Sequence, residues 1–465
     1  MLDHMPGLDR AALLEAATYV DRWTAFHREQ RDLPGLVVAI RYADELVLSQ
    51  GYGWARLEPG LAMAPDHIFR VASHSKMFTA TAIMQLVEQG KVRLDDRADA
   101  YVNWLDSDVT LRQLLNHAGG LIRDGLEADF WRVEQPFPDV DALRALGPDA
   151  SVLPPNTTFK YSNIGYGVLG HVIEAASGTP YNQYVQEHIV QRLGLTSTGP
   201  ELVPAVLERC VTGYTGKILG VPRRGVPGID TRALSAATGF YSTAEDLCRF
   251  AAAHWWGDET LLLDASKREM QHAAWTVEQS DQRYGLGFIA ERIGERDTVG
   301  HSGGFPGQST RTLFDPAERL VVVVLSNTSS QDGRAGPLAA QIVRFIDFAQ
   351  RWPGGSSADL TRYTGRFANV GGVLDVVAFG GKLFGLDPTD DNPTKLTAEF
   401  EVVDADRLRI TRCSGFDSPG EFLRYERDAT GTPQRVICGG VSLYPESIFR
   451  ERYASESHWQ PPAFK

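Results

Sequence analysis

The sequence predicts an α+β fold: a largely antiparallel sheet flanked by helices, with an inserted helical lobe, followed by a C-terminal antiparallel β-barrel. Three observations lead to this prediction. β-rich runs occur at residues 36–54 and again at 287–325, and helical patterns with long loops fill the stretch between them. Short β-patterned runs then follow a Gly/Ser-rich stretch at 353–357.

The first part of the chain predicts a helix and then a hairpin. Apolar side chains recur at helical spacing over residues 8–33, and Pro34 and Gly35 end that pattern. Residues 36–41 and 46–54 are β-rich and flank the turn at 42–45, which favours a hairpin.

The middle of the chain predicts the helical lobe and the return to the sheet. Helices are expected at 111–117, 164–176 and 243–254. Extended runs then occur at 287–290, 309–314 and 320–325, and a helix at 338–349 closes this part.

Residues 353–357 have the composition of a flexible linker, so we expect two domains, at 1–352 and 358–465. Gly and Pro turns separate the β-patterned runs of the second domain, which favours a small closed barrel. These runs are 364–368, 373–379, 382–386, 398–403, 407–411, 422–426 and 436–440.

Composition excludes several function classes. The formal net charge is −13, which disfavours binding to nucleic acid or to an anionic membrane. No apolar stretch approaches the ~20 residues that span a bilayer.

The N-terminus shows no secretory signal, so we expect a cytoplasmic protein; a processed N-terminus would leave a periplasmic or secreted location open. The four cysteines lack metal-ligand spacing, and we expect no metal and no cofactor.

Ser73 and Lys76 are the strongest candidates for catalysis. They precede a run that is apolar on nearly every side, which indicates a buried helix. Lys76 is the only formally charged residue between Arg70 and Glu88, and it lies one helical turn from Ser73. Burial lowers the pKa of a lysine, so this pair predicts an activated hydroxyl nucleophile. The alternative is an ordinary N-cap serine and a solvated lysine.

Tyr161 and Asn163 form a second candidate element. A cationic Lys76 nearby would make Tyr161 easier to ionise, so that it relays the Ser73 proton. Asn163 would then hydrogen-bond a substrate amide or carbonyl. The alternative for Asn163 is a purely structural N-cap of the helix that follows it.

The third element is the glycine-rich segment at 300–304. Gly303 and Gly304 allow the backbone to approach a ligand closely, and a main-chain N–H there would stabilise an oxyanion. His301 would donate a hydrogen bond into the site. The alternative is a polar hairpin turn.

The same segment also matches the Gly-x-Ser-x-Gly nucleophile elbow, with Ser302 as the nucleophile. That motif requires a helix after the serine and a histidine downstream. Here strand patterns follow, and the only later histidine is His458, beyond the linker. The context therefore excludes the elbow.

Together, Ser-x-x-Lys, Tyr-x-Asn and a late His-x-Gly resemble the serine β-lactamase and penicillin-binding protein superfamily, in its class C-like branch. The resemblance covers roughly residues 36–350 and includes the stretches 114–121, 161–166, 239–247 and 300–304. It implies a β-lactamase/transpeptidase-like sheet with a catalytic site between sheet and lobe. It also implies that Ser73 is acylated, that Lys76 and Tyr161 form the base, and that the N–H groups of Ser73 and Gly304 form the oxyanion hole.

The chain departs from this family at His301, where β-lactamases and transpeptidases usually carry the lysine of a Lys-Thr-Gly motif. A neutral histidine holds a substrate carboxylate less well than an ammonium does. This favours esterase, amidase or D-amino-acid peptidase activity over β-lactam hydrolysis. The final region, on residues 363–367 and 381–386, is similar to the lipocalin-like barrel of some D-aminopeptidases.

We therefore expect a serine hydrolase that cleaves a small ester, amide or short peptide, including D-amino-acid substrates, through an acyl-enzyme on Ser73. The alternatives are a β-lactamase or D-alanyl-D-alanine carboxypeptidase, a non-hydrolytic penicillin-binding sensor, and a scaffold with a vestigial site. Expected partners are the small-molecule substrate and, as an open option, further copies of the chain. We expect neither a nucleic-acid nor a membrane partner.

Overall fold

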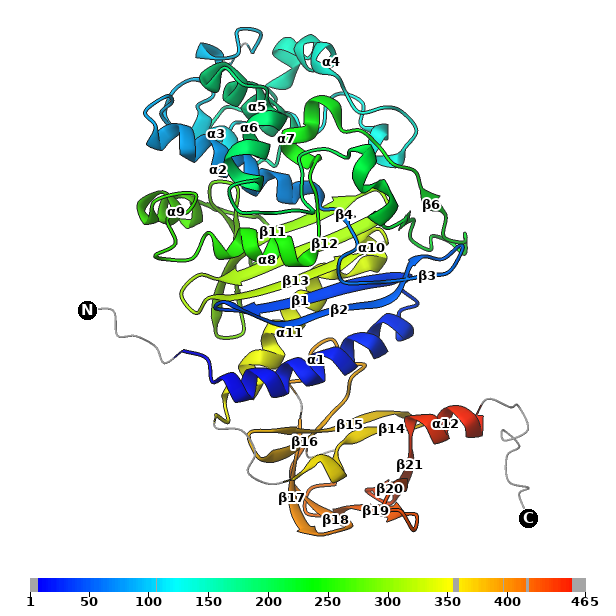
Figure 1. The fold of residues 1–465 in the computed structure, drawn as a ribbon. Coiled ribbons are helices and arrows are strands. Elements are labelled where there is room, and N and C mark those ends of the chain that lie inside the picture. The colour runs from blue at the N-terminus through cyan, green and yellow to red at the C-terminus, as the bar shows by residue number, and fades with distance from the viewer. Residues whose placement is uncertain (1–6, 106, 354–358, 396, 415–417, 454–465) are drawn as a thin grey trace. The chain divides into compact units, whose positions relative to one another are not determined.

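The computed structural model describes residues 7–105, 107–353, 359–395, 397–414 and 418–453 (Figure 1). Residues 354–357 of the predicted linker lie outside this part of the chain, and the domain boundary drawn from it stays a prediction. The chain divides into two compact units, one made of residues 28–343 and the other of residues 1–27 together with 344–465.

A nine-stranded antiparallel sheet forms the base of the 28–343 unit, in the order β3-β2-β1-β13-β12-β11-β10-β9-β8. Strands β1 and β13 lie side by side in it, so segments from the two ends of this unit complete one sheet. Every residue of β13 is buried, which explains its continuous run of Leu and Val. The strands are β1 (Gly35–Tyr42), β2 (Glu45–Arg56), β3 (Leu61–Ala62), β8 (Trp275–Thr276), β9 (Arg283–Tyr284), β10 (Ile289–Ile293), β11 (Arg296–Phe305), β12 (Gln308–Asp315) and β13 (Leu320–Ser326).

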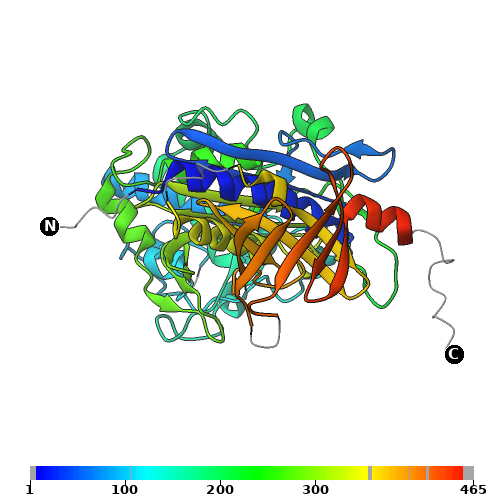
Figure 2. The same cartoon turned by 90° about the horizontal axis from the view of Figure 1, so that it is seen from below.

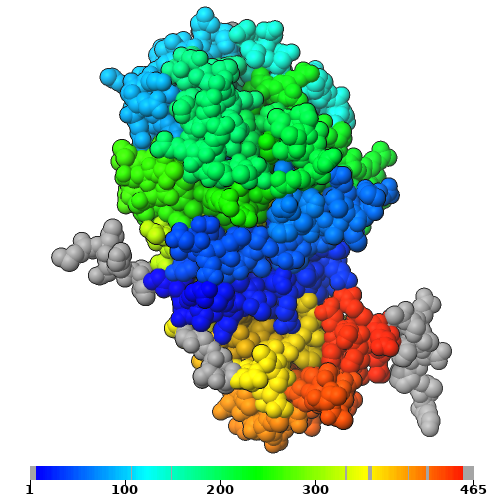
Figure 3. Space-filling view, in the orientation of Figure 1, coloured from blue at the N-terminus to red at the C-terminus, as the bar shows by residue number. Residues whose placement is uncertain are grey.

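The inserted helices gather on one side of this sheet; in Figure 1 helix α2 is blue and the later helices are cyan to green, and the same colours mark this region in Figure 3. Helix α2 is buried along nearly its whole length, and its Phe78 stacks between Phe240 and Phe250, with ring centroids 4.2 and 3.8 Å away. These helices are α2 (Ser75–Glu88), α3 (Leu111–Leu115), α4 (Val140–Ala145), α5 (Asn163–Ser177), α6 (Tyr181–Val185), α7 (Ser235–Thr238), α8 (Ala244–Ala252) and α9 (Asp264–Gln271), and the short helix α10 (Ser330–Gly333) follows β13. Two short strand pairs join them, β4 (Phe69–Arg70) with β7 (Tyr241–Ser242) and β5 (Gly213–Tyr214) with β6 (Gly225–Val226).

Helix α3 is shorter than the pattern at 111–117 predicts. It begins at a capping box, in which Thr110 and Gln113 exchange side-chain-to-backbone hydrogen bonds of 3.3 and 3.0 Å. It ends at Leu115, because His117 has a φ of +59° and so cannot continue a right-handed helix.

The second unit contains a closed barrel of eight antiparallel strands, which confirms the predicted fold class (Figure 2). Its strands are β14 (Gly365–Asn369), β15 (Gly372–Phe379), β16 (Lys382–Leu386), β17 (Ala398–Asp404), β18 (Arg407–Arg412), β19 (Phe422–Arg427), β20 (Pro433–Cys438) and β21 (Val441–Pro445). The last strand predicted, at 436–440, is wrong in extent. Gly439 and Gly440 both have positive φ and make the turn between β20 and β21.

Three helices contribute residues to this unit: most of α1 (Arg10–Gln30), the end of α11 (Ala335–Gln350) and α12 (Glu446–Tyr453). A buried polar cluster joins α1 to the barrel. The hydroxyl of Tyr19 donates to Asp375 at 3.0 Å, and Arg366 donates to both oxygens of that carboxylate at 2.7 and 2.8 Å. In the parts of the chain that the structure describes, no helix is long and apolar enough to cross a membrane.

Asp375→Ala is expected to destabilise the protein by about 3–5 kcal/mol, because it removes the buried carboxylate that accepts two hydrogen bonds from the Arg366 guanidinium and leaves, among the described residues, only the longer ion pair with Glu446, at 3.8 Å. Urea unfolding followed by circular dichroism measures the loss. Glu401→Ala, at an exposed position of the same barrel, is the matched control and should cost little. A loss for Asp375→Ala no larger than that of the control would contradict the stabilising role of this cluster.

Candidate active site

Ser73 lies in a short 3-10 turn, Ala72–His74, that runs directly into α2, rather than at the N-terminus of the helix itself. Ala72 has a φ of +49°, a left-handed conformation that costs a non-glycine residue about 1–2 kcal/mol. Ser75 holds this turn in place: its hydroxyl donates to the carbonyl of Ala72 at 2.6 Å and accepts the N–H of Phe240 at 3.0 Å. The turn therefore presents a half-buried Ser73 hydroxyl from a rigid base.

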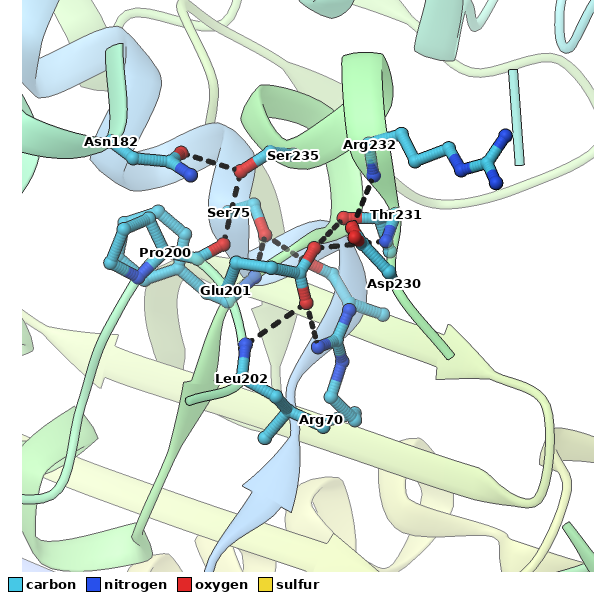
Figure 4. A network of polar contacts seen from close by, with 12 residues as sticks. Arg70, Ser75, Asn182, Pro200, Glu201, Leu202, Asp230, Thr231, Arg232 and Ser235 are labelled. Carbon is cyan, nitrogen blue, oxygen red and sulfur yellow. Dashed lines mark hydrogen bonds and ion pairs between the residues drawn. The ribbon is translucent and has the colours of Figure 1, made fainter. Parts of the chain in front are cut away.

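A buried ion pair fixes the strand that leads to this turn (Figure 4). Arg70, on β4, is paired with Glu201, and the same carboxylate accepts the backbone N–H of Thr231 at 2.9 Å. The backbone N–H of Arg70 also donates to the side chain of Gln308 on β12, at 2.8 Å. These contacts join β4 both to the 201–231 segment and to the sheet.

Lys76 is fully buried and surrounded by oxygen atoms. Its Nζ lies 3.2 Å from Ser73 Oγ, 2.7 Å from Asn163 Oδ1 and 2.8 Å from the carbonyl oxygen of Ala237. Burial lowers the pKa of Lys76 well below its ordinary value, and the carboxylate of Asp124 opposes this effect only in part. The expected direction of the Lys76 pKa is therefore confirmed, and it favours a neutral amine beside Ser73.

Tyr161, which lies just before helix α5, contacts the same hydroxyl: its Oη is 2.9 Å from Ser73 Oγ. The expectation that Tyr161 ionises more easily is wrong. Burial raises the pKa of Tyr161, and the hydrogen bond to Ser73 and the charge of Arg123 offset only part of that rise. Tyr161 therefore acts as a neutral phenol, able to pass a proton but not to serve as a standing phenolate. Ser73, Lys76 and Tyr161 together have the geometry of an activated nucleophile.

Asn163 lies beside Lys76, but it is not the N-cap of α5. That position belongs to Ser162, whose Oγ accepts the N–H of Gly165 at 2.9 Å. The Asn163 side chain instead accepts from Lys76 and donates through Nδ2 to Asp124 Oδ1 at 2.6 Å. Its carboxamide thus already has protein partners on both sides. Sequence reasoning missed Asp124, which no motif marks.

The segment 300–304 is part of strand β11, so its alternative interpretation as a hairpin turn is wrong. Strand β10 pairs with β11 only as far as Gly300, and from His301 to Phe305 the described partner of β11 is β12 alone. Gly303 packs against the turn that carries Ser73: a Cβ at this position would lie 2.2 Å from the carbonyl oxygen of Val71. Gly304 follows on the exposed face of this strand. Its place in an oxyanion hole with the N–H of Ser73 stays a prediction.

His301 is buried and both of its ring nitrogens have protein partners. Nδ1 lies 2.6 Å from the carbonyl oxygen of Ser302 and must carry the ring proton, because a carbonyl only accepts. Nε2 therefore accepts from the hydroxyl of Tyr284, at 2.9 Å. Burial, and then the charge of Lys76, lowers the pKa of His301 well below its ordinary value. His301 is thus neutral, and its one ring N–H is already donated to Ser302. The expectation that His301 donates a hydrogen bond into the site is therefore wrong.

Sequence reasoning missed two further aromatic side chains here, His117 and Tyr284, whose rings lie 4.7 Å apart. His117 lies in the stretch 114–121 that carried part of the family resemblance, and this was the available signal. Among the described residues, no group of three His, Cys, Asp or Glu side chains is arranged to hold a metal ion.

Comparison with known proteins gives a consistent result. The model of the Beta-lactamase family matches residues 20–344. Penicillin-binding protein 4 of Amycolatopsis lactamdurans is 28% identical over 67% of this chain and 85% of its own length. Among solved structures, an octameric penicillin-binding protein homologue from Pyrococcus abyssi has a TM-score of 0.65 at 22% identity and covers 92% of this chain and 99% of its own. D-amino acid amidase from Ochrobactrum anthropi SV3 has a TM-score of 0.60 at 24% identity, over 71% of this chain and 98% of its own.

The family match spans most of the chain, and the fold agrees with the expectation from the sequence motifs. The chain therefore belongs to the Beta-lactamase family, within the superfamily of serine hydrolases and penicillin-binding proteins.

Proposed function

We propose that this protein hydrolyses a small ester, amide or short peptide through an acyl-enzyme on Ser73. One observation carries the proposal: the Ser73 hydroxyl oxygen lies 3.2 Å from a buried lysine nitrogen and 2.9 Å from a tyrosine hydroxyl. This is the arrangement that serine nucleophiles need, with a base at hydrogen-bond distance and a second group to move the proton.

The reaction follows from these positions. Neutral Lys76 takes the proton of Ser73 as its Oγ bonds to the substrate carbonyl carbon, and the N–H groups of Ser73 and Gly304 hold the resulting oxyanion. The phenol of Tyr161 then passes its proton to the leaving alcohol or amine as the bond from that group to the carbonyl carbon breaks. Tyr161 takes a proton back from the Lys76 ammonium, which restores the neutral phenol and the neutral amine. Water attacks the ester on Ser73 by the same route in reverse and releases the acid.

The substrate class is proposed from the charge of the site. Neutral His301 cannot hold a substrate carboxylate by charge. D-amino acid amidase from Ochrobactrum anthropi shares the fold, and this supports including D-amino-acid amides among the substrates to test.

The alternative, a β-lactamase or a D-alanyl-D-alanine carboxypeptidase, has one observation in its favour. The exposed guanidinium of Arg123 lies 5.3 Å from the centre of the Tyr161 ring, close enough to the site to attract a carboxylate. Its ion pair with Asp124, at 2.9 Å, already neutralises part of that charge.

Two further expectations stay proposals. The homologue from Pyrococcus abyssi is octameric, which supports self-association of this chain. The cytoplasmic location expected from the N-terminus is untested.

Ser73→Ala is expected to abolish turnover of aryl esters, because Ser73 carries the hydroxyl that is hydrogen-bonded to Lys76 Nζ among the described residues. A fluorophosphonate probe should label the unmodified protein on the peptide that contains Ser73, as read by tandem mass spectrometry. Lys76→Ala should slow that labelling about 10²–10⁴-fold. Labelling of Ser302 instead would contradict the proposal and restore the nucleophile elbow.

His301→Lys is expected to shift preference toward substrates that carry a carboxylate, because it replaces a neutral ring with an ammonium. The ratio of kcat/KM for nitrocefin to that for a neutral aryl ester measures this shift. The unmodified protein should show a low ratio. Efficient nitrocefin hydrolysis that Arg123→Ala removes, with ester hydrolysis retained, would favour the β-lactamase alternative.

A further inference from the structure

His117 touches the proposed proton relay without being part of it. Its side chain is 1% exposed, and its ring lies against Tyr161 with centroids 4.2 Å apart and planes tilted by 35°. Three more aromatic rings enclose it, those of Tyr284, Tyr166 and Phe159, at 4.7, 5.1 and 5.7 Å. His117 therefore forms one wall of the pocket that holds the Tyr161 ring.

His117 also holds the backbone on both sides of Tyr161. Its Nδ1 accepts the N–H of Ser162 at 3.1 Å, and its carbonyl oxygen accepts the N–H of Lys160 at 2.7 Å. One residue thus fixes the position of the Tyr161 ring and the two peptide units around it.

The protonation of His117 argues against a proton-transfer role. Because Nδ1 accepts a backbone N–H, the ring proton lies on Nε2, which is buried and has no hydrogen-bond partner among the described residues. Burial and the charge of Lys76 lower the pKa of His117 well below its ordinary value, so the ring stays neutral. In the described part of the chain, neither ring nitrogen is hydrogen-bonded to Ser73 or Lys76.

The backbone of His117 is itself held in an unusual conformation. Its φ of +59° lies in the left-handed region, which is unfavourable for a residue with a side chain. The next residue, Ala118, anchors the turn by donating to Gln113 O at 2.8 Å. Strain of this kind persists where surrounding contacts over-determine it, and it often marks a functional position.

We propose that His117 is a positioning residue that holds the Tyr161 hydroxyl at hydrogen-bond distance from Ser73. It does so by two separable contacts, the ring against Tyr161 and the Nδ1 hydrogen bond to Ser162. The inference rests on the proposed function, because it matters only if Tyr161 moves a proton to or from Ser73.

Two variants separate the contacts. His117→Asn keeps an acceptor for Ser162 and tolerates left-handed backbone, but it removes the ring. His117→Phe keeps a ring and removes the acceptor. Each should lower kcat for an aryl ester about 10–100-fold with KM changed little, because misplacing a catalytic group by about 1 Å has an effect of that size. His188→Asn is the matched control: His188 lies 4.4 Å from the ring of Tyr184, away from Ser73, and its loss should leave kcat unchanged.

A double-mutant cycle with Tyr161→Phe decides between positioning and a general structural role. Where the Tyr161 hydroxyl is absent, substituting His117 should cost no further loss in the rate of fluorophosphonate labelling of Ser73. Losses that multiply in the double variant, or a native kcat for His117→Asn, would overturn the inference. Thermal unfolding of each variant reports whether it is folded. If His117→Phe does not fold, the cycle with His117→Asn decides. Failure of the unmodified protein to label at Ser73 would instead reject the proposed function.

Discussion

The rest of the site depends on the burial of Lys76. Three oxygens surround its Nζ, and this set fits the three donors of an ammonium as well as a neutral amine. Burial, which lowers the pKa of Lys76, is what favours the neutral form. In that form the two shorter contacts, to Asn163 and Ala237, take the N–H donors, and the lone pair is left for the Ser73 hydroxyl proton. An ammonium in the same place would meet a large desolvation cost. Among the described residues no carboxylate contacts Nζ directly, and the charge of Asp124 offsets only part of that cost.

Three helices must converge to build this environment. Lys76 lies on α2, Asn163 begins α5 and Ala237 is on α7. Helix α2 can occupy the centre of the lobe because it is apolar on nearly every side, and β11 can approach the turn that carries Ser73 because position 303 has no side chain. The helical lobe therefore supplies the oxygens of Asn163 and Ala237 around Lys76, and the sheet supplies Gly303, which packs against the turn that carries Ser73.

The sequence predicted what is local and missed what comes from remote packing. Ser73 and Lys76 are three residues apart, and this spacing predicted that their side chains lie together. In the structure Lys76 Nζ is 3.2 Å from Ser73 Oγ. The pKa of Tyr161 is raised and not lowered as expected, because desolvation by burial outweighs the hydrogen bond to Ser73 and the charge of Arg123. The partner of Asn163, Asp124, is 39 residues away and has no sequence signal. Strand β11 was not predicted because its glycines have low strand propensity, whereas β12 supplies pairing along its length.

The state of Lys76 is the central claim, and its titration tests that claim most directly. The Cε resonance of Lys76 in ¹³C-lysine-labelled protein, assigned by its loss in Lys76→Met, reports the pKa of the amine. We expect a pKa well below the ordinary 10.5, with kcat/KM falling as the pH drops through that same value because the base becomes protonated. A Lys76 that titrates near 10.5 while the protein is fully active at neutral pH would contradict its role as the base for Ser73.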